Sequence, residues 1–104
     1  MDGLKIIKED ALDIMHLVEK NPKISQRSIS KESGFSIGKV NYCLKALVDV
    51  GYIKLINYKN SSNKSNYMYV MTPKGIKEKL IITKRFIKKK QDEYNKLKSY
   101  IESD

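Results

Sequence analysis

Hydrophobic residues recur along residues 36–48 with the spacing of one helical face. They occupy positions i, i+3, i+4, i+7 and i+8, as Val40, Cys43, Leu44, Leu47 and Val48. The opposite side of this predicted helix carries small, amide, phenol and charged side chains: Gly38, Asn41, Tyr42, Lys45 and Asp49, with Lys39 on the flank. Ser36 is placed to cap the helix. Because one side is suited to packing and the other to polar contacts, the pattern predicts a recognition helix.

A second, shorter helix is predicted just before it, over residues 26–33. Ser25 is its capping residue, and Gly34 suits the left-handed conformation that commonly ends a helix. Only three residues, Gly34-Phe35-Ser36, then separate the two helices. Two helices joined by a tight, glycine-containing turn are typical of a helix-turn-helix.

The first helix is predicted over residues 5–20 and ends before Asn21-Pro22, because the residue before a proline disfavours helical geometry. One apolar stripe consists of Ile7, Ala11, Ile14, Met15 and Val18. A second consists of Leu4, Leu12 and Leu17. A helix that is apolar on two sides is expected to have two packing neighbours.

Two strands follow the recognition helix, over Tyr52–Tyr58 and Tyr67–Met71, both rich in β-branched and aromatic residues. The segment between them is entirely polar, with Lys59 and Lys64 near its ends. A hairpin with a polar, basic tip after a helix-turn-helix is typical of a wing that contacts DNA. A solvated turn without a DNA contact is the alternative.

Thr72-Pro73 begins a last helix, which would be about 43 Å long if it reaches Ile101. Apolar residues recur along it at heptad positions: Ile76, Leu80, Ile87, Tyr94, Leu97 and Ile101. Thr83 and Lys90 interrupt this seam. So long an apolar helix needs a partner, and a second copy of the chain is the preferred one. The alternative is that it folds back onto Leu4, Leu12 and Leu17.

These elements predict one mainly α-helical unit with a small β-hairpin wing, in which residues 1–71 form a winged helix-turn-helix and residues 72–104 a dimerisation helix. The 104 residues carry a formal charge of +9, which favours a polyanionic partner. Residues 20–71 contain nine Lys and Arg side chains against two acids, whereas residues 1–19 contain two against five. The basic excess therefore lies in the predicted DNA-binding region and beyond it.

Other function classes find little support. No apolar run approaches the roughly 18 residues of a membrane span and no secretory segment follows Met1, so a cytoplasmic location is expected. His16 has no nearby nucleophile or metal-ligand spacing, and Cys43, the only cysteine, falls on the packing side of its helix. We expect no enzymatic activity, no metal and no cofactor.

Residues 25–54 read S-Q-R-S-I-S-K-E-S-G-F-S-I-G-K-V-N-Y-C-L-K-A-L-V-D-V-G-Y-I-K. This stretch resembles winged-helix regulators of the MarR type, most closely the small MarR-like regulators associated with exopolysaccharide gene clusters. The resemblance implies a dimeric, sequence-specific DNA-binding transcription factor. Typical MarR proteins are longer and bind phenolic ligands between a larger dimerisation region and the DNA-binding lobe. Because only one helix precedes the helix-turn-helix here, whether an effector exists is left open.

The polar face of the predicted recognition helix, together with the helix before it, suggests roles in DNA binding for individual side chains. Asn41 has the amide geometry for adenine, and Lys39 or Lys45 would reach guanine or a phosphate. Tyr42 would contact a phosphate or a thymine methyl, or instead pack on the wing. The remaining residues are expected to contact or approach the DNA backbone, namely Ser36 as helix cap, Gly38 by close approach, and Gln26 and Arg27 as clamps.

The sequence thus favours a dimeric repressor that binds double-stranded DNA. One alternative is a winged-helix adaptor that binds another protein through Ile81, Phe86 and Tyr100. RNA binding is a weaker alternative, because no exposed aromatic pair is predicted on a sheet.

The wing hypothesis predicts the behaviour of Lys64→Ala. Removal of a phosphate contact should lower affinity uniformly for all DNA sequences and reduce the slope of log K against log salt by about 1. Fluorescence polarisation over a salt series measures both quantities. A slope equal to that of the unmodified protein would argue against a wing contact.

Overall fold

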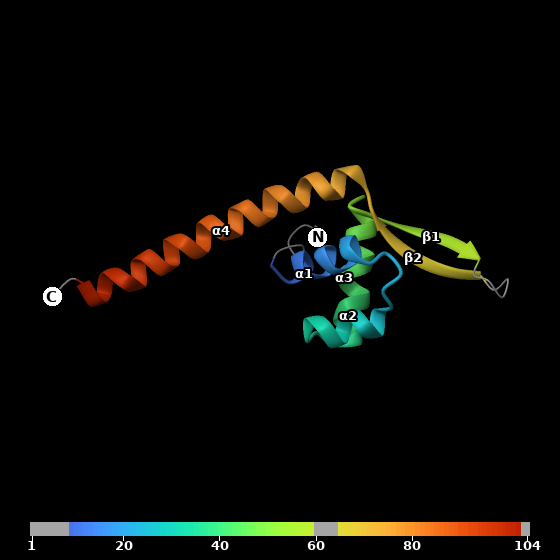
Figure 1. The fold of residues 1–104 in the computed structure, drawn as a ribbon, viewed down its shortest axis with the longest axis horizontal. Helices are drawn as coiled ribbons and strands as arrows, with labels where there is room; N and C mark the ends of the chain where they lie inside the picture. Colours follow the sequence, from blue (N-terminus) through green and yellow to red (C-terminus); the bar gives the residue numbers. More distant parts are fainter. Residues whose placement is uncertain (1–8, 60–64, 103–104) are drawn as a thin grey trace.

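The structure, a computed structural model, describes residues 9–59 and 65–102. Its elements, in chain order, are α1 (Glu9–Lys20), α2 (Gln26–Ser33), α3 (Ile37–Asp49), β1 (Ile53–Lys59), β2 (Ser65–Met71) and α4 (Pro73–Glu102). Figure 1 shows the hairpin and α4 leaving the three-helix body in opposite directions. The predicted fold class, a winged helix-turn-helix with a long C-terminal helix, is confirmed.

The predicted helix boundaries rest on caps that the structure contains. Ser25 Oγ accepts a hydrogen bond from the Ser28 amide, and Ser36 Oγ accepts one from the Lys39 amide. Gly34 ends α2 with φ 81°, the left-handed conformation expected of it. The predicted start of the first helix, with Leu4 and Ile7, lies outside the described residues. The described part of α1 ends at Lys20, just before Asn21-Pro22, as predicted.

The core lies where α1, α2, α3 and the base of the hairpin meet. The stripe predicted on the first helix is buried over its described part, at Ala11, Ile14, Met15 and Val18. It packs against Ile29 of α2 and the inner face of α3, and Tyr52, Ile53 and Met71 close the cluster from the hairpin. Burying a large apolar side chain contributes about 1.5–3 kcal/mol, so this cluster orients the recognition helix.

The two strands are antiparallel and pair from Ile53 with Met71 to Lys59 with Ser65. The ladder is longer than predicted, because β2 begins two residues before Tyr67 and β1 reaches Lys59. Backbone hydrogen bonds extend the pairing through polar residues, since the ladder does not depend on the polarity of the side chains.

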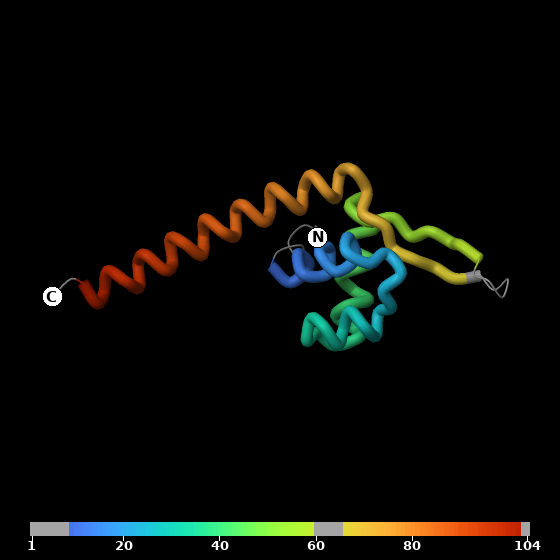
Figure 2. The backbone as a smooth tube through the Cα atoms, in the orientation of Figure 1, coloured from blue at the N-terminus to red at the C-terminus, as the bar shows by residue number. Residues whose placement is uncertain are grey.

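The first half of α4 lies along α1, and the rest extends beyond the body (Figure 2). Ile82 packs against the core, and Lys90 pairs with Glu9 at 2.8 Å. The hydrogen bond and negative charge of Glu9 raise the pKa of Lys90. Past this pair, every residue of the helix that the structure describes is exposed, and the protein measures 68 Å along its longest axis. The helix therefore folds back onto its own chain over its first half only.

The beginning of α4 is held against the end of α3 by close backbone contacts. Thr72 Oγ1 donates to the Gly51 carbonyl oxygen at 2.6 Å, and the Thr72 amide donates to the Tyr52 carbonyl oxygen at 3.0 Å. A β-carbon built at Gly75 would lie 2.0 Å from that same Tyr52 oxygen. Only glycine therefore fits where α4 contacts the segment that joins α3 to β1.

Gly75→Ala should destabilise the protein by about 1–3 kcal/mol, because the added methyl group meets backbone that has to move. Urea unfolding followed by circular dichroism measures the change. The control is Gly38→Ala, where the nearest atom to the added carbon, Ser36 Oγ, is 4.0 Å away. This control should leave the free energy of unfolding unchanged or raise it by up to about 1 kcal/mol. Equal midpoints for both variants would contradict the close packing at Gly75.

Candidate nucleic-acid interface

The two faces of α3 are as different in the structure as in the sequence. Val40, Cys43, Leu44 and Leu47 are at most 1 % exposed. On the other side Tyr42 is 56 % exposed, and Ser36, Gly38 and Lys45 are exposed as well. Tyr42, for which partial packing on the wing was the alternative, thus leaves more than half of its side chain exposed. The outer face of α3 is therefore open to solvent.

Lys39 is directed away from this outer face. Its Nζ lies 2.6 Å from Asp10 Oδ2 on α1 and 4.4 Å from the centroid of the Phe35 ring. An exposed ion pair of this kind is worth about 0–1 kcal/mol, so a DNA phosphate could replace Asp10 at little cost. Lys45, by contrast, needs no rearrangement to reach outward.

Asn41 is half-buried and hydrogen-bonded to α2. Its Nδ2 donates to Oε1 of Gln26 at 3.3 Å, and Nε2 of Gln26 donates to the hydroxyl of Tyr69 at 3.3 Å. Gln26, predicted as a backbone clamp, is itself half-buried and uses its amide inside the protein. Arg27, the other predicted clamp, is exposed on α2.

A pocket of about 250 Å³ lies between the recognition helix and the wing, and its lining includes Asn41, Lys45, Leu55 and Tyr69. Lys59 is exposed at the end of β1, close to the tip. Lys64 lies outside the described residues. The outer face of α3 and the wing therefore border one continuous hollow.

Cys43 is buried on the inner side of α3, and this burial raises the pKa of its thiol. A thiol that is inaccessible and resists ionisation is a poor redox sensor. The burial of Cys43 agrees with its predicted place on the packing side of the helix.

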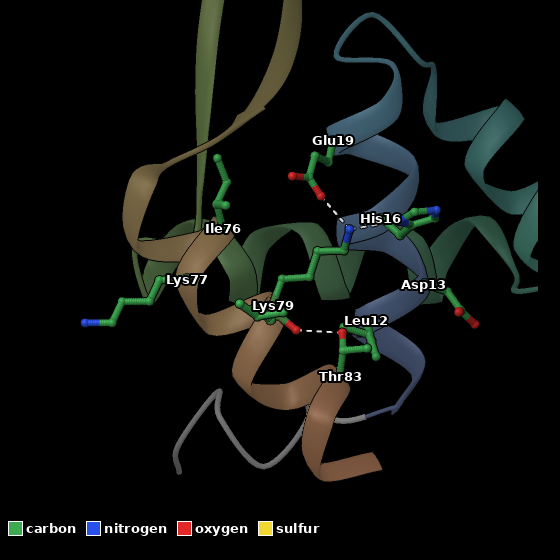
Figure 3. Close-up of a pocket in the computed structure, with 9 residues that line it drawn as sticks. Leu12, Asp13, His16, Glu19, Ile76, Lys77, Lys79 and Thr83 are labelled. Carbon is green, nitrogen blue, oxygen red and sulfur yellow. Dashed lines mark hydrogen bonds and ion pairs between the residues drawn. The ribbon is translucent and has the colours of Figure 1, made fainter. Parts of the chain in front are cut away.

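A larger pocket, of about 560 Å³, lies between α1 and α4 (Figure 3). Lys79 extends across from α4 to Glu19, with its Nζ also 2.8 Å from His16 Nδ1. Leu12, Ile76 and Leu80 supply its apolar lining. Two of these three residues belong to the predicted dimerisation seam, so the pocket and the seam form one apolar surface.

That seam is exposed along its whole length. The exposed fractions of its side chains range from 47 % to 80 %, at Ile76, Leu80, Ile87, Tyr94, Leu97 and Ile101. Within the described helices, none is long and apolar enough to span a bilayer. The remaining surface of α4 is mainly polar, although Tyr100, one of the residues considered for the adaptor, is also 60 % exposed.

Sequence reasoning missed Tyr69 and Leu55, which face each other across the hairpin and line the hollow beside α3. Tyr69 is 43 residues from its partner Gln26. No local pattern reports such a distant contact, since it depends on how the hairpin folds against the helices.

Comparison with known proteins agrees with this geometry. Residues 4–54 match the family model described as winged helix-turn-helix DNA-binding. No curated protein sequence matches the chain. The protein therefore has a winged helix-turn-helix DNA-binding fold.

Three solved structures show the same fold. The protein smu.1704 from Streptococcus mutans UA159 has a TM-score of 0.68 and 21 % identity, over 89 % of this chain and 86 % of that one. Staphylococcus aureus MarR, solved with salicylate and kanamycin, has a TM-score of 0.62 and 20 % identity, over 85 % of this chain and 57 % of that one. Streptococcus pneumoniae FabT, solved with DNA, has a TM-score of 0.57 and 22 % identity, over 83 % of this chain and 58 % of that one.

The winged helix-turn-helix fold implied by the resemblance of residues 25–54 to MarR-type regulators is thereby confirmed. The nearer resemblance to the exopolysaccharide-associated subgroup stays a prediction. The chain spans less than two thirds of MarR and of FabT.

Proposed function

We propose that this protein is a sequence-specific, double-stranded DNA-binding transcriptional regulator that acts as a homodimeric repressor in the cytoplasm. The observation that carries the proposal is the division of α3 into a fully buried face and an open one. A helix anchored in this way is a rigid support for side chains that enter a major groove. The charge of +9 supplies the attraction to phosphates.

In this proposal the base-reading residues are Asn41 and Lys45, with Tyr42 beside them on the exposed face of α3. Asn41 suits adenine and Lys45 suits guanine or a phosphate. Ser36 and Gly38, at the exposed N-terminus of α3, allow the backbone to approach a phosphate. Arg27 and the wing lysines, Lys59 and Lys64, hold the protein on the DNA backbone.

Residues 1–71 would bind DNA and residues 72–104 would pair two copies. The exposed seam of α4 supports this division, because apolar side chains at heptad spacing favour association with a second helix. Two paired recognition helices would contact half-sites about 34–36 Å apart, or a multiple of that spacing. Repression requires only that such a dimer occupy a promoter.

The dimer proposal predicts that Leu97→Glu shifts the protein towards monomer, because the substitution places a charge in the apolar seam. Sedimentation equilibrium of the full-length protein measures the shift. Asn95→Glu is the matched control, since it adds the same charge at an exposed position of the same helix turn but outside the seam. Its self-association should equal that of the unmodified protein. A monomeric full-length protein would remove the two-half-site geometry.

The DNA-binding proposal is tested by selecting duplexes from a random library and measuring affinity for the selected site and its single-base variants. Asn41→Ala should cost about 1–3 kcal/mol on the selected site and relax preference at one base pair. Weak binding that is indifferent to sequence would instead favour the adaptor. If Asn41→Ala instead weakened binding to every duplex equally, the base-reading role of Asn41 would be refuted, and the DNA-binding proposal would stand.

A further inference from the structure

Three side chains from separate elements meet behind the outer face of α3. Asn41 of α3 donates to Gln26 of α2, and Gln26 donates to the hydroxyl of Tyr69 on β2. Each of the three side chains is half-buried. We propose that Tyr69 is a specificity-determining positioning residue, which acts through Gln26 to hold the Asn41 amide in the orientation that reads a base pair. The inference rests on the proposed function, since Asn41 is the residue that Tyr69 would serve.

The hydrogen-bond pattern is compatible with base recognition. A side-chain amide has two Nδ2 hydrogens and one oxygen acceptor. Contact with Gln26 uses one hydrogen of Asn41. The other hydrogen and Oδ1 are the pair that contacts N7 and N6 of adenine. Asn41 can therefore keep its bond to Gln26 while it reads the base.

The network also restrains where the two amides lie. Gln26 bridges the other two side chains, with its Oε1 at the Asn41 amide and its Nε2 at the Tyr69 hydroxyl. With the hydroxyl gone, Gln26 loses one of its two side-chain partners and can rotate away from Asn41. Asn41 would then present its atoms to the base in more than one arrangement, only one of which matches adenine. Holding a side chain in its binding conformation lowers the entropic cost of recognition.

Tyr69 is well placed to act as the fixed end of the network. Tyr69 pairs with Leu55 across the hairpin, and it lines two pockets, of about 250 and 310 Å³. The backbone ladder between β1 and β2 sets where this ring lies. The position of the hydroxyl therefore follows the fold of the wing, and Asn41 is coupled to the wing through it.

Gln26 takes a different role here from the backbone clamp expected from the sequence. Loss of a backbone clamp weakens binding to all duplexes equally. Loss of a residue of this network should instead weaken only the discrimination at the base pair that Asn41 reads. The two roles are therefore separable by experiment.

The test uses Tyr69→Phe in the full-length protein and the duplex selected by the unmodified protein, together with its variants at the base pair where Asn41→Ala relaxes preference. Discrimination there should fall by about three- to tenfold, as expected for one hydrogen bond. Affinity for an unrelated duplex, the salt slope and the unfolding midpoint should stay unchanged. Tyr67→Phe is the matched control, because Tyr67 lies on the same face of β2 and is 66 % exposed. It should discriminate like the unmodified protein.

A double-mutant cycle separates positioning from a direct contact. In the Asn41→Ala background, Tyr69→Phe should change discrimination no further. Gln26→Met should reproduce the Tyr69→Phe result, and the two changes should not add. A uniform loss on all duplexes, additivity with Asn41→Ala, or unaltered discrimination by Tyr69→Phe would each overturn the inference.

A measurement without DNA keeps this inference distinct from the proposed function. Tyr69→Phe should shift the side-chain amide resonances of Gln26 and Asn41 in a nitrogen–proton NMR spectrum, whereas Tyr67→Phe should not. If the unmodified protein selects no sequence but these resonances shift, the regulator proposal fails while the network stands. If it selects a sequence and the resonances do not move, the inference about Tyr69 fails alone.

Discussion

The burial of one face of α3 is the constraint on which the rest of this structure depends. Val40, Cys43, Leu44 and Leu47 are removed from water by α1, α2 and the base of the hairpin. Their burial fixes the rotation of α3 about its own axis, so the residues on the opposite side, Gly38, Tyr42, Lys45 and Asp49, face outward. An open polar face therefore follows from a closed apolar one.

The start of α4 meets the core at a crowded junction. Tyr52 is part of the core, and its carbonyl oxygen accepts a hydrogen bond from Thr72. Gly75 lies too close to the same oxygen for any side chain to fit. This junction sets where α4 begins, and the contacts of Ile82 and Lys90 with the body then hold the helix along α1.

The surface proposed to bind DNA and the exposed apolar seam lie on different elements. Three of the four acidic side chains of α1 pair with lysines of other elements: Asp10 with Lys39, Glu19 with Lys79, and Glu9 with Lys90. Lys45 and Arg27 lie exposed on α3 and α2. The exposed apolar seam continues from the α1–α4 pocket along α4. The regions proposed for DNA and for a second copy therefore do not overlap.

Sequence alone determined the elements of this protein and the faces that α1 and α3 bury. The caps at Ser25, Ser36 and Thr72 and the glycine at Gly34 are local signals, because the hydrogen bonds and dihedral angles that they satisfy lie within a few residues. The stripe on α3 and the seam on α4 were readable for the same reason, since helical periodicity is a property of neighbouring positions.

Only the tertiary structure determined which polar side chains meet. Lys39 turns to Asp10, Gln26 turns inward to Asn41, and Tyr69 joins them from the hairpin. It also determined that α4 folds back along α1 and then leaves it after Lys90. These contacts join residues that are far apart in the chain, and no periodic pattern encodes them. Which side chains become partners depends on how the elements pack, and this packing cannot be inferred from neighbouring positions in the sequence.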